Sequence, residues 1–192
     1  PCHGTAAASQ IGNMTTADTE WSFASWISGS EFQGAVLSLT GGDARGASVL
    51  AGSTLEDLLT RLISEKLAEN GDPETAERLD YSTKCSSARE MQLISERMLL
   101  ELRTLGRVRN EFAHNPAPDL DFDSPDIASA VERLRSPSRA ARGREIAGVG
   151  TGVGEALEKA MPLGVTGRRY WWTVAMLSVM AILAARLDAL LS

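Results

Sequence analysis

The chain has 192 residues, 43% of them hydrophobic and 23% charged, which is enough for one globular domain with its own core. Its formal net charge of −6 argues against a protein that grips duplex DNA over a broad surface, which needs clustered lysine and arginine. The two cysteines lie far apart in the sequence, so no disulfide is expected. No cysteines or histidines have the spacing of metal ligands, and neither a metal nor a cofactor is expected.

The N-terminal third is expected to hold a tail and then helices. Residues 1–17 are small and polar, without the apolar run of a secretory signal, and are predicted to be a disordered tail. Apolar residues follow over 19–39 but are broken by small residues at 28–30, so two short helices or one broken helix would fit. A long amphipathic helix is then predicted to reach about Glu69 and to end at the cap formed by residues 70–71.

The middle of the chain predicts three more helical segments. Asp72, Pro73 and Glu74 are typical of a helix start, and that segment is expected to run to about Met91. Ser95 is expected to cap the next helix, which ends before Pro116. After an acidic link, Ser124 and Pro125 begin another helix, whose buried stripe is predicted to be Ile127, Ala130, Val131 and Leu134.

The C-terminal part divides into a connection and a last helix. Residues 136–167 are rich in Gly, Ser and Arg and are predicted to be a long flexible connection, in which the glycines match no phosphate-loop spacing. Tyr170–Ala185 holds 16 uncharged residues, fewer than the roughly 20 that cross a bilayer. A buried helix, no membrane span and a cytoplasmic location are therefore expected.

Helical spacing dominates the chain, and no segment shows the alternation of a strand. The expected fold is all-α, a single-domain bundle of about six or seven helices within residues 18–192.

The segment Arg107–His114, RVRNEFAH, concentrates polar chemistry in two helical turns. On a helix, Arg107, Asn110 and His114 share one face, Arg109 lies at its flank, and the neighbouring apolar side chains point elsewhere. The four polar residues therefore predict a cationic, hydrogen-bonding surface.

Three interpretations of this surface remain open. Arg109 and Asn110 would be structural if they held carbonyls or carboxylates of neighbouring helices, with His114 favoured by the helix dipole. They would be catalytic if the arginine stabilised phosphate charge and the histidine acted as general acid or base in metal-independent RNA cleavage. In the third interpretation, all four residues bind a partner.

The stretch Leu93–Leu134 resembles the mannitol operon repressor family, whose members carry a helix ending in an Arg-Asn-x-Phe-Ala-His signature, followed by a Phe-x-x-Pro-x-Ile link. Here the link is formed by Phe122, Pro125 and Ile127. Asp43–Leu59 looks like the family's Asp-Arg-Gly-leading helix, and Ser82–Ser95 like its Ser-x-Lys helix with a Gly-Leu-Ile-Ser turn.

The chain also departs from that family. Ala44 interrupts the Asp-Arg-Gly order, Gln92 replaces the turn glycine, and a Gly-Pro-Leu stretch after the first long helix is missing. The resemblance implies an all-helical transcription-regulator-like binding module, more readily a non-enzyme than an enzyme. It also implies repression through a protein partner as readily as through DNA. A homodimer is expected, and no sequence-specific DNA binding by the chain alone.

Arg109 and His114 are also similar, more distantly, to the ribonuclease motif of the HEPN superfamily, in which an arginine, four residues and a histidine often meet at a dimer interface. Under this alternative the catalytic residues are Arg109, Asn110 and His114.

Overall fold

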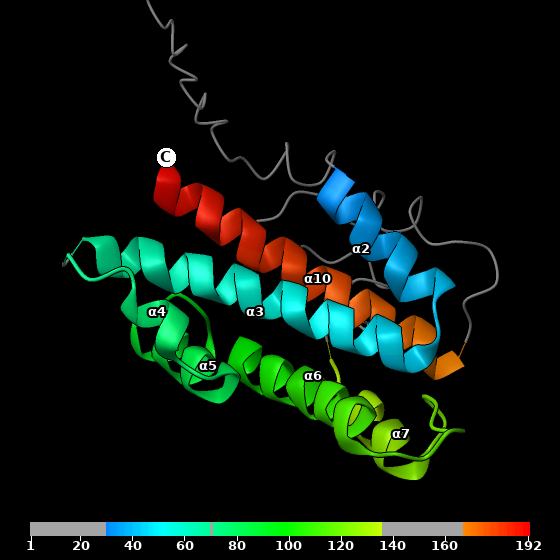
Figure 1. The fold of residues 1–192 in the computed structure, drawn as a ribbon. Coiled ribbons are helices and arrows are strands. Elements are labelled where there is room, and N and C mark those ends of the chain that lie inside the picture. Colours follow the sequence, from blue (N-terminus) through cyan, green and yellow to red (C-terminus); the bar gives the residue numbers. More distant parts are fainter. Residues whose placement is uncertain (1–29, 70, 136–166) are drawn as a thin grey trace, which may run out of the picture.

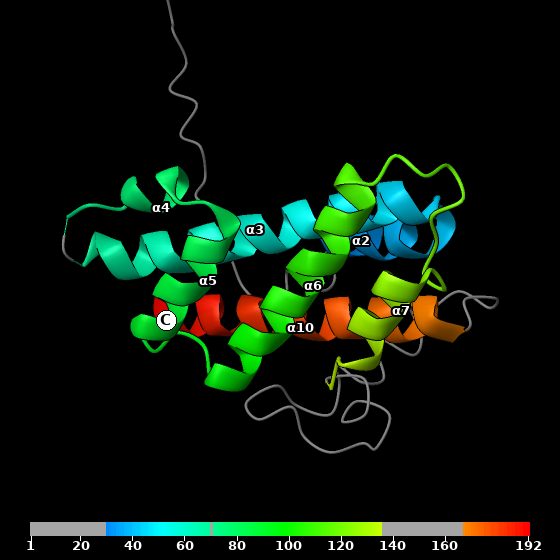
Figure 2. The same ribbon diagram turned by 90° about the horizontal axis from the view of Figure 1, so that it is seen from below.

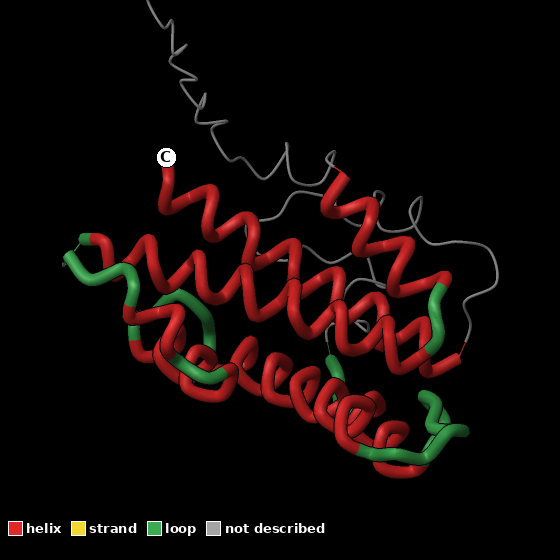
Figure 3. The backbone as a smooth tube through the Cα atoms, viewed as in Figure 1, coloured by secondary structure: helices red, strands yellow, loops and turns green. Residues whose placement is uncertain are grey.

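The computed structural model describes residues 30–69, 71–135 and 167–192, and the seven helices in these ranges pack as one bundle with no strand among them (Figures 1 and 3). The predicted all-α fold is therefore confirmed. The predicted tail, the first part of the segment 19–39 and the predicted connection lie outside the described residues. The helices are α2 (Ser30–Gly41), α3 (Ala44–Ala68), α4 (Thr75–Arg78), α5 (Tyr81–Glu90), α6 (Glu96–His114), α7 (Pro125–Glu132) and α10 (Gly167–Leu191).

The helices α3 and α10 lie side by side in the middle of the bundle. Helix α2 covers one side of this pair, and α4, α5, α6 and α7 cover the other (Figures 1 and 2). Asp43 caps α3 by accepting a hydrogen bond of 2.8 Å from the Gly46 N–H, and Gly71 after its end has a left-handed φ of 82°, as predicted for the C-terminal cap. The inner face of α3 is wholly apolar over Leu55, Leu58, Leu59, Leu62 and Ile63.

The single helix predicted over residues 72–91 is wrong. Asp72 accepts a hydrogen bond from the Thr75 hydroxyl, and only the short α4 follows, ending where Leu79 turns extended with a ψ of 140°. Asp80 then caps a new helix, α5, by accepting a hydrogen bond of 2.8 Å from the Thr83 N–H. That bond lowers the pKa of Asp80. The second capping carboxylate therefore divides the segment in two.

Helix α6 begins as predicted, since the Ser95 hydroxyl accepts a hydrogen bond from the Met98 N–H at 3.2 Å. Pro125 lies in the first turn of α7, also as predicted. The predicted stripe of α7 is buried. Helix α6 turns an apolar face into the core through Met98, Leu99, Leu102, Leu105, Val108 and Phe112.

An aromatic row joins α6 to α10 through the link between α6 and α7. The Phe122 ring lies 5.0 Å from that of Phe112 and 4.8 Å from that of Trp172, measured between centroids, and all three side chains are buried. This row attaches the C-terminal part of α6 to the centre of the bundle.

Helix α10 is long and apolar enough to cross a membrane, with a mean hydropathy of 2.0 over its most apolar 18 residues. Within the fold, 61% of that stretch is buried, mainly against α3. A core helix and a membrane-spanning helix both satisfy this pattern.

Candidate functional site

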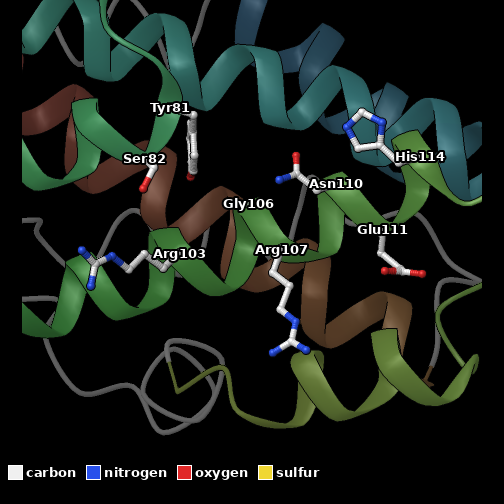
Figure 4. A pocket seen from close by; sticks show the side chains of 8 residues that line it. All are labelled: Tyr81, Ser82, Arg103, Gly106, Arg107, Asn110, Glu111 and His114. Carbon is white, nitrogen blue, oxygen red and sulfur yellow. The ribbon is translucent and has the colours of Figure 1, made fainter.

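The outward side of α6 carries an open pocket of about 440 Å³ that it shares with the first turn of α5. Arg107, Asn110 and His114 all line this pocket and are exposed, but the Arg107 side chain points away from the other two. Figure 4 shows Asn110 and His114 on one side of α6, and Arg107 and Glu111 on the other. The remaining lining residues are Tyr81, Ser82, Arg103 and Gly106.

The floor of the pocket depends on Gly106 of α6. A Cβ at this position would lie 2.5 Å from Cε1 of Tyr81, so only glycine lets the ring lie against the helix. The Tyr81 hydroxyl donates a hydrogen bond of 2.9 Å to the Leu102 carbonyl and ties α5 to α6. Sequence reasoning missed Tyr81, because nothing local in the sequence indicates that α5 packs on this face.

Arg109 does not line the pocket, although it was expected to join the binding surface. Its Nη2 atom lies 3.1 Å from Oε2 of Glu56 on α3, and its aliphatic part packs over Gly52, where a Cβ would lie 2.6 Å from its Cγ. The other Glu56 oxygen binds Nζ of Lys84 at 3.1 Å, and the Lys84 side chain is only 6% exposed. Glu56 therefore joins α3, α5 and α6 through two cations.

This ion cluster also orients Asn110. Nη1 of Arg109 donates a hydrogen bond of 3.0 Å to Oδ1 of Asn110. The Asn110 oxygen is therefore engaged, and its amide group is left as the hydrogen-bond donor toward the pocket. Arg109 thus acts on the pocket through Asn110.

His114 is the last residue of α6, and the end of the helix is held by Arg45 of α3. The Arg45 guanidinium donates to the carbonyl oxygens of Phe112 and, at 3.0 Å, of Ala117. In addition, Asn115 donates from its side chain to Glu111 at 2.9 Å. Sequence reasoning missed the role of Arg45, which lies 67 positions before Phe112 in the chain.

The pocket is therefore lined by two guanidiniums, an amide donor and an imidazole, together with the Glu111 carboxylate, which accepts the hydrogen bond from Asn115. Such a surface suits an anionic or hydrogen-bond-accepting ligand. Within the described ranges, no three His, Cys, Asp or Glu side chains gather as metal ligands.

No protein-family model, curated protein or solved structure matches the chain. What the site does is therefore argued from its residues.

The Glu56 cluster yields a prediction for stability. Glu56→Gln removes the charge that balances the buried Lys84, and we expect the free energy of unfolding to fall by about 2 kcal/mol, less than for a fully buried pair because Glu56 is 27% exposed. Urea denaturation measures the change. Asp57→Asn, at the exposed next position, is the matched control and should have little effect. An equal loss in the two variants would contradict the role assigned to the cluster.

Tyr81 and Cys85 of α5 yield a prediction for pH. Burial raises the pKa of the Cys85 thiol from 9.0 to about 11, and burial also raises the pKa of Tyr81 well above 10.0. Between pH 9 and 11 the folded chain keeps protons that the unfolded chain releases, so these groups lower the stability as the pH rises.

The reactivity of the Cys85 thiol tests this burial. At pH 9, iodoacetamide should alkylate Cys85 far more slowly in the folded chain than in urea, as measured by peptide mass spectrometry. Equal rates in the two states would contradict the buried, protonated thiol.

Proposed function

We propose that the chain is a regulatory binding module that binds a protein partner through the α6 face, defined as Arg103, Arg107, Asn110 and His114. The observation that carries the proposal is that these four residues line an open pocket, whereas the opposite side of the same helix supplies core residues. Charged and hydrogen-bonding groups held on a rigid helix give specificity to a protein interface.

The resemblance to the mannitol operon repressors supports a role in transcription control. Gln92, where that family carries glycine, has a φ of 61°, in the left-handed region that favours glycine. Arg45, from the Asp-Arg-Gly-like segment, holds the end of α6, and Phe122 of the Phe-x-x-Pro-x-Ile link is buried. The positions that carry the resemblance thus have physical roles in this fold.

Direct reading of DNA is not part of the proposal. The chain carries a net charge of −6, and its α6 face is a short basic patch rather than a recognition helix entering a groove. We also propose a cytoplasmic homodimer, in which the two-fold contact lies outside the α6 face and leaves that face to the partner.

A second candidate function is metal-independent RNA cleavage. The observation in its favour is that His114 and Arg107 line the same pocket. His114 would take the proton of a ribose 2′-hydroxyl, whose oxygen attacks the adjacent phosphorus and breaks its bond to the 5′ oxygen, which takes up a proton from water. Arg107 would stabilise the phosphate charge. Arg109, engaged by Glu56, would act only by orienting Asn110.

Transcript profiling tests the proposed function. Deleting the gene should raise the transcripts of at least one operon several-fold, and the wild-type gene should restore repression. The double variant Arg107→Ala, His114→Ala should fail to restore it, although both residues are exposed and its melting temperature should stay within about 2 °C of the wild type. Arg61→Ala, an exposed position on α3, is the matched control and should restore repression.

Full restoration by the double variant would contradict the proposal. If the purified chain cleaves mixed RNA and the His114→Ala variant does not, RNA cleavage replaces the regulatory binding function as the better proposal.

A further inference from the structure

A second and larger depression lies next to the pocket, between the N-terminal half of α6 and the end of α7. It measures about 1020 Å³, and five arginines line it together with the exposed Leu100. We call it the arginine groove and define it by Arg97, Leu100, Arg103, Arg107, Arg133 and Arg135. Arg103 and Arg107 line both the groove and the pocket, so the two depressions adjoin along α6.

The positive charge of the groove is largely uncompensated within the described ranges. Two carboxylates at its border are engaged elsewhere, Glu132 with Arg168 at 2.7 Å and Glu96 with Arg89 at 3.2 Å. By contrast, Arg97, Arg107 and Arg133 form no ion pair with any residue that the structure describes. A concave surface with several free guanidiniums favours an anionic ligand.

Glu101 fixes the wall of the groove and limits which anion fits. It is only 5% exposed, and its Oε1 atom accepts a hydrogen bond of 2.8 Å from the Arg135 N–H, which holds the end of α7 against α6. Its Oε2 atom has no hydrogen-bond partner among the described residues. The negative charge of Glu101 in the wall disfavours a long chain of phosphates more than a peptide in which acidic side chains alternate with apolar ones.

The apolar part of the groove also favours a polypeptide. Leu100 lines the groove and is 56% exposed, and the buried Leu134, just after α7, also lines it. An apolar side chain between acidic ones would cover Leu100 while the carboxylates reach the arginines. The link between α6 and α7 carries Asp119, Asp121 and Asp123, and Asp126 follows in the first turn of α7, so a long polyanion that extended toward this link would meet negative charge.

We propose that the arginine groove docks a short acidic segment of a protein partner, with an apolar side chain seated on Leu100. This inference rests on the proposed function and names the chemistry of the partner. The groove supplies the charge recognition, and the adjoining α6 face supplies hydrogen bonds from Asn110 and His114.

Fluorescence anisotropy with the full chain tests the docking site. The probe is a fluorescein-labelled ten-residue peptide of alternating Glu and Leu, compared with the same peptide carrying Lys for Glu and with a labelled ten-nucleotide single-stranded RNA. At about 150 mM salt, where long-range attraction is screened, the acidic peptide should bind and the other two probes should bind at least about tenfold more weakly.

Matched variants locate the site. Arg97→Ala with Arg133→Ala should weaken binding of the acidic peptide by about tenfold, whereas Arg61→Ala with Arg186→Ala removes the same charge from exposed positions elsewhere and should leave it unchanged. Leu100→Ser should weaken binding as well, and Leu37→Ser, at an exposed leucine of α2, should not.

Two results would overturn the proposal: equal losses in the groove and control variants, or RNA binding as tight as that of the peptide. The transcript assay separates this failure from failure of the proposed function. Full repression by the Arg97→Ala, Arg133→Ala variant would reject the groove as the docking site, without contradicting partner binding through the α6 face. A deletion that changes no transcript would reject the regulatory function itself.

Discussion

The Glu56 carboxylate is shared by two cations, and this arrangement joins α6 to α3 and α5. One oxygen binds the nearly buried Lys84 of α5, and the other binds Arg109 of α6. A buried ammonium without a counter-charge costs several kcal/mol, so the three helices are held at one relative rotation. With Arg109 bound inward, Arg107 and Asn110 are left to face outward, and the Asn110 oxygen is bound by the same guanidinium.

This rotation gives α6 two distinct sides. Its apolar side is buried from Met98 to Phe112 and continues through Phe122 to Trp172 of α10, so most of the packing energy of the helix lies there. Its polar side does not take part in this packing and carries two adjoining depressions. Because the outward groups are carried on a helix packed against α3, α7 and the aromatic row, their backbone positions are set before binding, which lowers the entropy lost when a partner docks.

Much of this could be predicted from the sequence, because it depends on local rules. A few neighbouring residues are enough to indicate the helical period of α6, the Ser95 cap and the proline at the start of α7. The structure has each of these features. The break between α4 and α5 also has a local signal, because Asp80 is a strong capping residue. That signal was missed because Asp72 also looks like a helix start.

The site itself could be predicted only in part. Helical spacing placed Arg107, Asn110 and His114 together, but it could not show that the long side chain of Arg109 bends toward α3. That depends on Glu56, 53 positions away, and on the absence of a Cβ at Gly52. Arg45 and Tyr81 escaped prediction for the same reason, since each acts through contacts between helices. The arginine groove likewise exists only once the end of α7 is placed beside α6.

The most direct measurement of the central claim is residue-resolved modification of arginines by phenylglyoxal, followed by mass spectrometry of the folded full chain. Arg97 and Arg107 should be modified rapidly, because their guanidiniums are exposed and form no ion pair with the described residues. Arg45 and Arg109 should be protected by their carbonyl and carboxylate partners, and should react only once urea unfolds the chain. Modification of Arg109 as fast as that of Arg107 in the folded protein would contradict the account, since α6 would then not be held through Glu56.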